Sequence, residues 1–159
     1  ARDVADAIGA DRVGIRLSPW STFNDMAHYP ELDDAYTYLA AELQKIGIVY
    51  VHLVDHSRLS GLSTAAETAK AIRRVFTNSY ISSGNYTTLA DIEDALVRGK
   101  ADLVSMSRPF IANPDLIERL RRDLPLSAPN PATFYAPGPK GFSDGYTDYP
   151  MVEPVRRSA

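Results

Sequence analysis

Hydrophobic residues cluster in four short runs along the chain, separated by longer stretches in which polar and apolar residues mix. The runs cover residues 12–17, 48–54, 79–83 and 102–106. Apolar residues are nearly continuous within each run instead of strictly alternating, which is typical of strands buried on both faces of a parallel sheet. We therefore expect four buried, parallel strands.

Four helices are expected between and after these strands. The first is marked by hydrophobic residues spaced three and four apart and by a terminal glycine: Leu32, Ala35, Leu39, Leu43, Ile46 and Gly47. The second and third cover residues 65–75 and 89–97, with Thr88 as the N-cap of the latter. For the fourth, Asn113 is the expected cap and Pro114 the first helical residue. Strands alternating with helices over four units predict right-handed βαβ crossovers and an α/β fold.

Prolines and glycines replace this regular pattern after Leu124, which predicts an irregular tail. The tail carries five aromatic residues, too many for a disordered segment: Phe134, Tyr135, Phe142, Tyr146 and Tyr149. The sequence therefore predicts two parts, four βα units in residues 1–124 and a tail in residues 125–159 that packs on them.

Composition excludes several classes of function. The 159 residues carry a net charge of -3, which argues against a broad surface for nucleic acid or for an anionic membrane. The absence of cysteine excludes disulfides and thiolate ligands, and three histidines offer little for a metal, so no metal site is expected. No apolar run approaches the roughly 20 residues of a membrane span, and no signal peptide pattern opens the chain. We expect a cytoplasmic protein.

Candidate chemistry lies at the carboxyl ends of the strands, where parallel α/β sheets bind their ligands. After the third strand, Ser83, Gly84 and Asn85 would let backbone amides approach a ligand closely. After the fourth, Ser107 adds an amide and Arg108 a guanidinium that can make two hydrogen bonds to a phosphate. Together these two turns predict a phosphate site.

Arg16 is the unexpected residue of the first strand, VGIRLSPW, because a buried cation needs a partner. It either pairs with an internal carboxylate or faces a ligand. A ring attached to the predicted phosphate could extend toward Arg16, and a reduced flavin carries negative charge at its N1 and C2 carbonyl edge that a fixed cation would stabilise. Among the histidines, only His56 stands at a strand end, as a site candidate or as a satisfied structural side chain.

Six stretches of the chain occur in the order found in the C-terminal half of the Old Yellow Enzyme family, which this sequence resembles. They are VGIRLSPW with Phe23-Asn24, VYVHLVDHS, ISSGNYT, SMSRPFIANPDL, TFY and GYTDYP. Members of this family are (β/α)8-barrel flavoproteins that use FMN, take hydride from NADPH or NADH and reduce activated alkenes. The resemblance implies an FMN-dependent ene-reductase of that fold.

The resemblance also implies a role for individual residues. It assigns the flavin pyrimidine edge to Arg16, and the FMN phosphate and its surroundings to Ser83, Gly84, Asn85, Ser107 and Arg108. It assigns the substrate pocket to Phe23 and Tyr135, of which Tyr135 is also a candidate for catalysis. The segment 57–77 is shorter than in relatives, so contacts that cap the substrate are expected to differ. Ser107 stands where glycine is common in the family, a change that should not prevent phosphate binding.

A complete barrel needs about 250 residues and eight strands, whereas this chain supplies four predicted strands. In the family, the residues that hold the substrate carbonyl and donate the proton lie in the N-terminal half. We expect an N-terminal half-barrel chain or a second copy to close the sheet, and the isolated chain to be inactive. Two alternatives remain: a half-barrel module that binds a phosphate-bearing ligand without catalysis, and a doubly wound domain with helices on both sheet faces.

Overall fold

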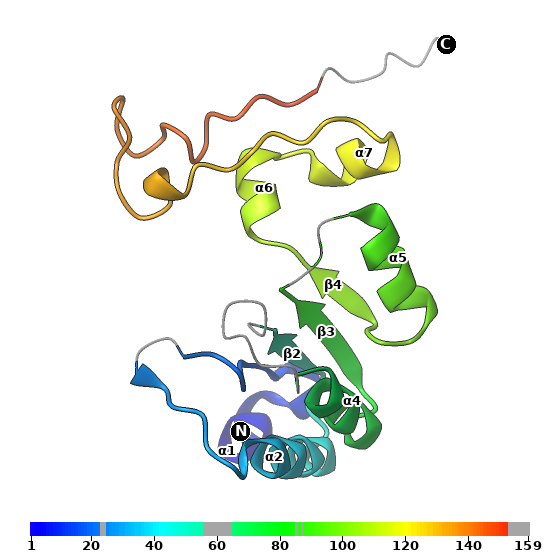
Figure 1. The fold of residues 1–159 in the computed structure, drawn as a ribbon. Helices are drawn as coiled ribbons and strands as arrows, with labels where there is room; N and C mark the ends of the chain where they lie inside the picture. The colour runs from blue at the N-terminus through cyan, green and yellow to red at the C-terminus, as the bar shows by residue number, and fades with distance from the viewer. Residues whose placement is uncertain (23–24, 56–64, 85, 87, 153–159) are drawn as a thin grey trace. The chain divides into compact units, whose positions relative to one another are not determined.

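The computed structural model describes residues 1–22, 25–55, 65–84, 86 and 88–152 (Figure 1). The chain forms two compact units, Ala1–Ser105 and Met106–Ala159. The first unit holds the sheet, and the second holds two short helices and the irregular tail. The boundary expected near residue 124, between half-barrel and tail, stays a prediction.

Four parallel strands form one sheet in the first unit: β1 (Gly14–Leu17), β2 (Tyr50–Val54), β3 (Ser79–Ser83) and β4 (Leu103–Ser105). Each strand pairs with its neighbour in sequence, in the order β1-β2-β3-β4 (Figure 1). The four predicted strands are thus confirmed, although β1 starts later than expected because Ala10–Arg12 forms a 3-10 turn (η1). A doubly wound sheet reverses its strand order, and the described sheet has no such reversal.

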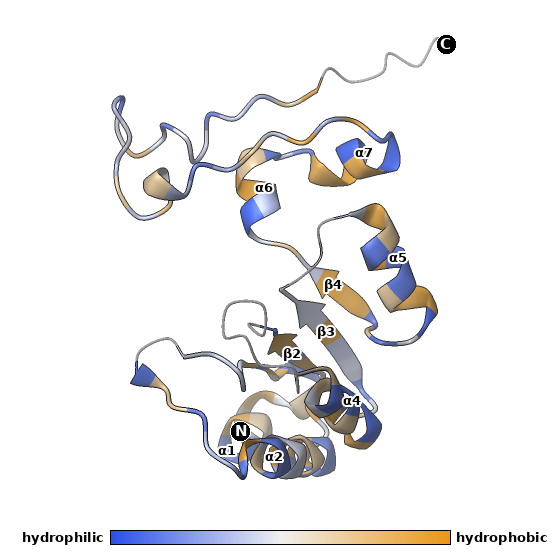
Figure 2. Ribbon diagram, in the orientation of Figure 1, coloured by the Kyte–Doolittle hydropathy of each residue, from blue (hydrophilic) through white to orange (hydrophobic). Residues whose placement is uncertain are grey.

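Helices cover one face of this sheet. They are α1 (Arg2–Ile8), α2 (Leu32–Ile46), α4 (Ala65–Val75) and α5 (Leu89–Val97). Side chains alternate along each strand, and one set packs with residues of α2 and α4 in the core of the unit: Leu17, Val51, Leu53, Tyr80, Ala40, Leu43 and Ile72. Hydrophilic and hydrophobic residues alternate along both helices, as an amphipathic face requires (Figure 2).

The predicted helix ends are borne out where local chemistry determines them. Gly47 ends α2 with a positive φ of 81°, and its N–H donates to the carbonyls of Leu43 and Gln44. Thr88 caps α5 through a reciprocal pair of hydrogen bonds with Asp91.

The opposite face of the sheet, called here the inner face, carries the other set of strand side chains. One row across it consists of Arg16, His52, Ile81 and Leu103, which are register partners on the four strands. Leu103 is 55% exposed. A side chain at Gly14 would overlap the Tyr50 ring, so glycine there makes room for that ring. In a closed barrel this face would line the interior.

The second unit corrects one prediction about its helices. It contains α6 (Arg108–Ala112) and α7 (Leu116–Arg121), and Asn113 ends α6 instead of capping the next helix. The fully buried Asn113 amide donates to the carbonyls of Pro109 and Ser127, and its oxygen accepts the Ser127 N–H. The helix after Pro114 therefore begins at Leu116, because Asn113 joins α6 to the tail.

The tail is held against α7 by hydrogen bonds to a buried ion pair within that helix. Arg119 is 7% exposed, and its Nε lies 2.7 Å from Asp115 Oδ1. The remaining guanidinium nitrogens donate to the carbonyls of Pro125 and Pro150, while Asp115 Oδ2 accepts the Val152 N–H. Polar contacts thus fix the path of the tail.

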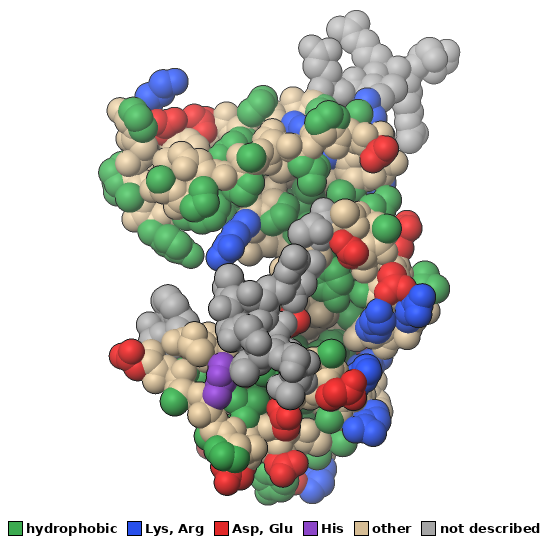
Figure 3. All heavy atoms as spheres, in the orientation of Figure 1, with side chains coloured by type: hydrophobic (Ala, Val, Ile, Leu, Met, Phe, Trp, Pro, Cys, Tyr) green, Lys and Arg blue, Asp and Glu red, His purple; other side chains and the backbone are tan. Residues whose placement is uncertain are grey.

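The described part of the chain shows neither a membrane-spanning helix nor a metal site. None of its helices has both the length and the apolar character to cross a membrane. Among the described residues, no group of three His, Asp or Glu side chains is placed to hold a metal ion. On the face drawn in Figure 3, Lys and Arg side chains are interspersed with Asp and Glu along the helices of the first unit.

Candidate functional site

Arg16 and Ser83 lie on the same face and at the same end of the sheet. Arg16 belongs to the inner-face row of His52, and Ser83 belongs to the next row toward the carboxyl ends, with Val54 and Ser105 as register partners. Arg16 is exposed. Within the described residues it makes no ion pair and no hydrogen bond, so an internal carboxylate partner is not found there. Its charge is available to a ligand.

Gly84 shapes the turn that leaves β3. Its φ of 131° is one that other residues rarely adopt, and a Cβ on it would overlap the carbonyl oxygen of Asp55. The Asp55 N–H also donates to the Ser83 carbonyl at 2.9 Å, which extends the ladder between β2 and β3. Only glycine lets this turn pack on the end of β2 and leave its backbone exposed. A close approach of backbone to phosphate needs such a turn.

The N-terminus of α5, by contrast, is already satisfied by its own side chains. Thr88 Oγ1 accepts the Asp91 N–H at 3.1 Å, and the Asp91 carboxylate accepts the Thr88 N–H at 3.2 Å. The carboxylate adds negative charge where a phosphate would otherwise be attracted. Amides for an anion would therefore come from the turn at Ser83 and Gly84, not from the first turn of the helix.

The second unit presents its own pair of polar residues. Ser107 is the N-cap residue of α6 but makes no capping hydrogen bond with its side chain, and Arg108 is the first residue of that helix. Both are exposed, and no ion pair to Arg108 is found within the described ranges. Among the described residues, the side chains of both therefore have donors without a partner, as an anion site requires.

Of the four remaining site candidates, only Tyr135 lies within the described residues. Tyr135 is 98% exposed, and its ring meets Phe134 edge to face with centroids 6.4 Å apart. Phe23, Asn85 and His56 lie outside the described residues.

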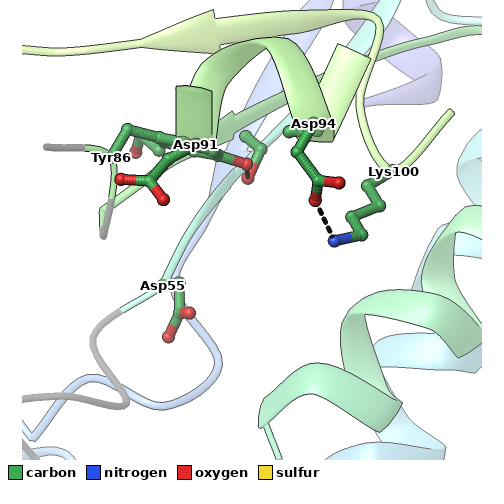
Figure 4. A pocket seen from close by; sticks show the side chains of 8 residues that line it. Asp55, Tyr86, Asp91, Asp94 and Lys100 are labelled. Carbon is green, nitrogen blue, oxygen red and sulfur yellow. Dashed lines mark hydrogen bonds and ion pairs between the residues drawn. The ribbon is translucent and has the colours of Figure 1, made fainter. Parts of the chain in front are cut away.

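A cavity of about 240 Å³ lies beside β3 and α5 (Figure 4). Its lining includes three carboxylates and one ammonium group: Asp55, Asp91, Asp94 and Lys100. Lys100 Nζ is held by Asp94 Oδ2 at 2.6 Å. Because the lining is net negative, this cavity is unsuited to a phosphate, although Ser83 borders it.

His52 is the residue that sequence reasoning passed over. Its Nε2 is buried and has no hydrogen-bond partner in the described structure. Burial lowers the pKa of the imidazole, and the nearby Arg16 guanidinium lowers it further. In the sequence, His52 could have been singled out because it is a polar residue inside an apolar strand. The structure shows that it is the register partner of Arg16.

Known proteins match this chain over most of its length. Residues 1–127 match the model of the NADH:flavin oxidoreductase / NADH oxidase family. The 12-oxophytodienoate reductase 2 of Arabidopsis thaliana is 38% identical over 153 residues, which cover 94% of this chain and 39% of that protein. Two solved structures are similar as well. Morphinone reductase in complex with tetrahydroNAD has 34% identity and a TM-score of 0.79 over 99% of this chain and 41% of its own.

The second structure is the old yellow enzyme from Trypanosoma cruzi, with 29% identity and a TM-score of 0.81. That match covers 96% of this chain and 38% of the other. The chain therefore spans about two-fifths of the length of the relatives it matches.

Proposed function

The chain belongs to the NADH:flavin oxidoreductase / NADH oxidase family, and we propose that it is the C-terminal, FMN-binding part of an NAD(P)H-dependent ene-reductase. The resemblance to the Old Yellow Enzyme family and the expected fold class, half of a (β/α)8 barrel, are both confirmed. In this proposal the substrate is a small activated alkene, and an N-terminal half-barrel or a second copy completes the sheet. A cytoplasmic location is also proposed.

The uncompensated charge of Arg16 is the observation that carries the proposal. Within the described structure the guanidinium has no carboxylate partner, and it shares the inner face and the carboxyl end of the sheet with Ser83. A cation held beside the flavin pyrimidine edge would stabilise the negative charge that develops there on reduction. The guanidinium is also exposed, so its charge is open to a ligand on this face.

The phosphate end of FMN would be bound by residues that fit an anion. The Gly84 turn has the positive φ and the close backbone packing that exclude a side chain. We propose that the amides of Ser83 and Gly84, with Asn85 beside them, bind the phosphate together with Ser107 and Arg108.

Substrate binding would fall to Phe23 and Tyr135, with the groups that hold the substrate carbonyl in the N-terminal half. When bound, FMN supplies the hydride chemistry that protein side chains lack. The residues of this chain would bind the cofactor, orient it and supply its counter-charge.

The proposal is tested by preparing the chain with and without a candidate N-terminal half. A yellow, FMN-bearing mixture that oxidises NADPH in the presence of an enone supports it. FMN binding without turnover in that mixture supports the alternative, a half-barrel module that binds a phosphate-bearing ligand without catalysis. Failure of both samples to bind FMN contradicts the flavin proposal altogether.

Arg16→Met is expected to lower the reduction potential of bound FMN by about 30 mV or more. Loss of one charged hydrogen bond, worth about 1.5 kcal/mol, has this effect on a two-electron couple. The potential is measured by spectroscopic titration against a reference dye. Arg12→Met is the matched control, because it removes the same charge from η1 at the other end of β1. Equal potentials in wild type and Arg16→Met would remove Arg16 from the site.

Arg108→Ala is expected to weaken FMN binding about 10- to 100-fold and to leave the visible spectrum of bound FMN almost unchanged. The guanidinium would bind the phosphate, far from the coloured ring, through charge-assisted hydrogen bonds. Equilibrium dialysis measures the affinity. Arg121→Ala, at the far end of α7, serves as the control. Unchanged affinity in Arg108→Ala would place the phosphate elsewhere.

A further inference from the structure

Arg16 and His52 are direct neighbours on the inner face of the sheet. They are register partners on the parallel strands β1 and β2, whose backbones run about 4.8 Å apart. The row continues with the apolar residues Ile81 and Leu103. Among the described strand residues of the inner face, Arg16 is the only cation.

Each of the two neighbours has hydrogen-bonding capacity that the described structure leaves unused. The His52 Nε2 is buried without a partner in the described structure, which is unfavourable for a polar group. The Arg16 guanidinium has five N–H donors and, within the described ranges, neither a hydrogen bond nor an ion pair. A neutral imidazole with its proton on Nδ1 presents Nε2 as an acceptor. The unused acceptor and the unused donors therefore match in chemistry and in position.

We propose that His52 is a positioning residue for Arg16, whose guanidinium donates a hydrogen bond to the His52 Nε2 and is thereby held at the flavin edge. The benefit for the flavin rests on the function proposed above, whereas the pairing of the two side chains does not.

A neutral partner suits this task better than a carboxylate. A free arginine side chain loses rotamer entropy when it is held in one orientation. An aspartate or glutamate could orient it, but would also neutralise the charge that the reduced flavin needs. Histidine orients the guanidinium and leaves its charge intact, provided that the imidazole stays neutral. Burial and the adjacent cation both favour the neutral ring.

The pairing is tested first by NMR titration of the histidines in this chain, within the protein as purified. Only three histidines occur, and His52→Gln identifies the resonance of His52. We expect His52 to titrate below the ordinary value of about 6.5, and Arg16→Met to raise its pKa because a nearby positive charge is lost. Ile81→Val changes packing in the same row and is the control. A His52 pKa that does not move in Arg16→Met overturns the pairing, whether or not FMN binds.

The second test is a double-mutant cycle on FMN affinity and on the flavin reduction potential in the assembled, FMN-bound protein. His52→Leu is expected to weaken FMN binding about 10-fold and to lower the potential, as loss of one hydrogen bond to a charged group predicts. His52→Gln, which keeps an acceptor, should recover most of both effects. In an Arg16→Met background, His52→Leu should add almost nothing, because it acts through Arg16.

The outcomes separate this inference from the function on which it rests. Equal losses from His52→Leu with and without Arg16, or no recovery in His52→Gln, overturn the positioning role while FMN binding stands. If the wild-type protein binds no FMN, the proposed function fails, and the NMR titration still decides whether the two side chains are paired.

Discussion

Gly84→Ala is expected to reduce FMN affinity at least 100-fold and to destabilise the protein by about 3 kcal/mol. The added Cβ would overlap the carbonyl oxygen of Asp55, and alanine rarely adopts a φ of 131°. The turn must then move away from the end of β2, and the amides proposed to bind the phosphate move with it. Fluorescence titration with FMN measures the affinity, and urea denaturation measures the free energy of unfolding.

Gly99→Ala is the matched control for this prediction. Gly99 also has a positive φ, of 64°, but a Cβ there meets nothing within 4 Å. It should cost about 1 kcal/mol of stability, the usual penalty of a left-handed residue, and leave FMN affinity unchanged. If Gly84→Ala retains full affinity in a folded protein, the turn after β3 does not hold the phosphate.

Asn113→Asp is expected to destabilise the protein by about 3 kcal/mol at neutral pH, although the two side chains have nearly the same shape. The fully buried Asn113 amide donates to two carbonyl oxygens, at Pro109 and Ser127. A carboxylate would lose both hydrogen bonds and place a negative charge against the same two oxygens. Because α6 begins with Arg108, we also expect weaker FMN binding when its end is released.

The pH dependence of unfolding provides a second readout. Burial would raise the pKa of the introduced carboxyl group above its unfolded value of about 3.9. The difference from wild type should therefore be largest at neutral pH and shrink as the pH falls and the group is protonated. Asn130→Asp is the control, because within the described residues the Asn130 side chain acts only as an acceptor, from the Ala132 N–H at 3.2 Å. Equal stabilities of wild type and Asn113→Asp would contradict the bridging role.

Strand and helix order could be predicted from the sequence because their signals are local. The strand from Ser79 to Ser83 and the end of α2 at Gly47 coincide with the predictions. The Thr88 cap was also readable, since it depends on a residue only three positions away. Six motifs in the expected order indicated the family, and the comparisons confirm it.

Contacts between distant residues could not be predicted in this way. Asn113 resembles a helix cap in the sequence, but its side chain bonds to Ser127, fourteen positions later. The short helix α6 was missed because five residues carry too little hydrophobic periodicity. The hydrogen bonds that hold the tail against α7 were not predicted, because Arg119 contacts the Pro150 carbonyl, thirty-one positions away in the sequence.

For the candidate site, the sequence by itself determined which chemical groups are present and at which strand ends they stand: Arg16, the Gly84 turn, and Ser107 with Arg108. Only the tertiary structure decided that Arg16 has no carboxylate partner among the described residues and that His52 pairs in register with Arg16. The reason is physical. Backbone propensity acts over a few residues, whereas the partner of a side chain depends on which strands pair and which face each residue meets.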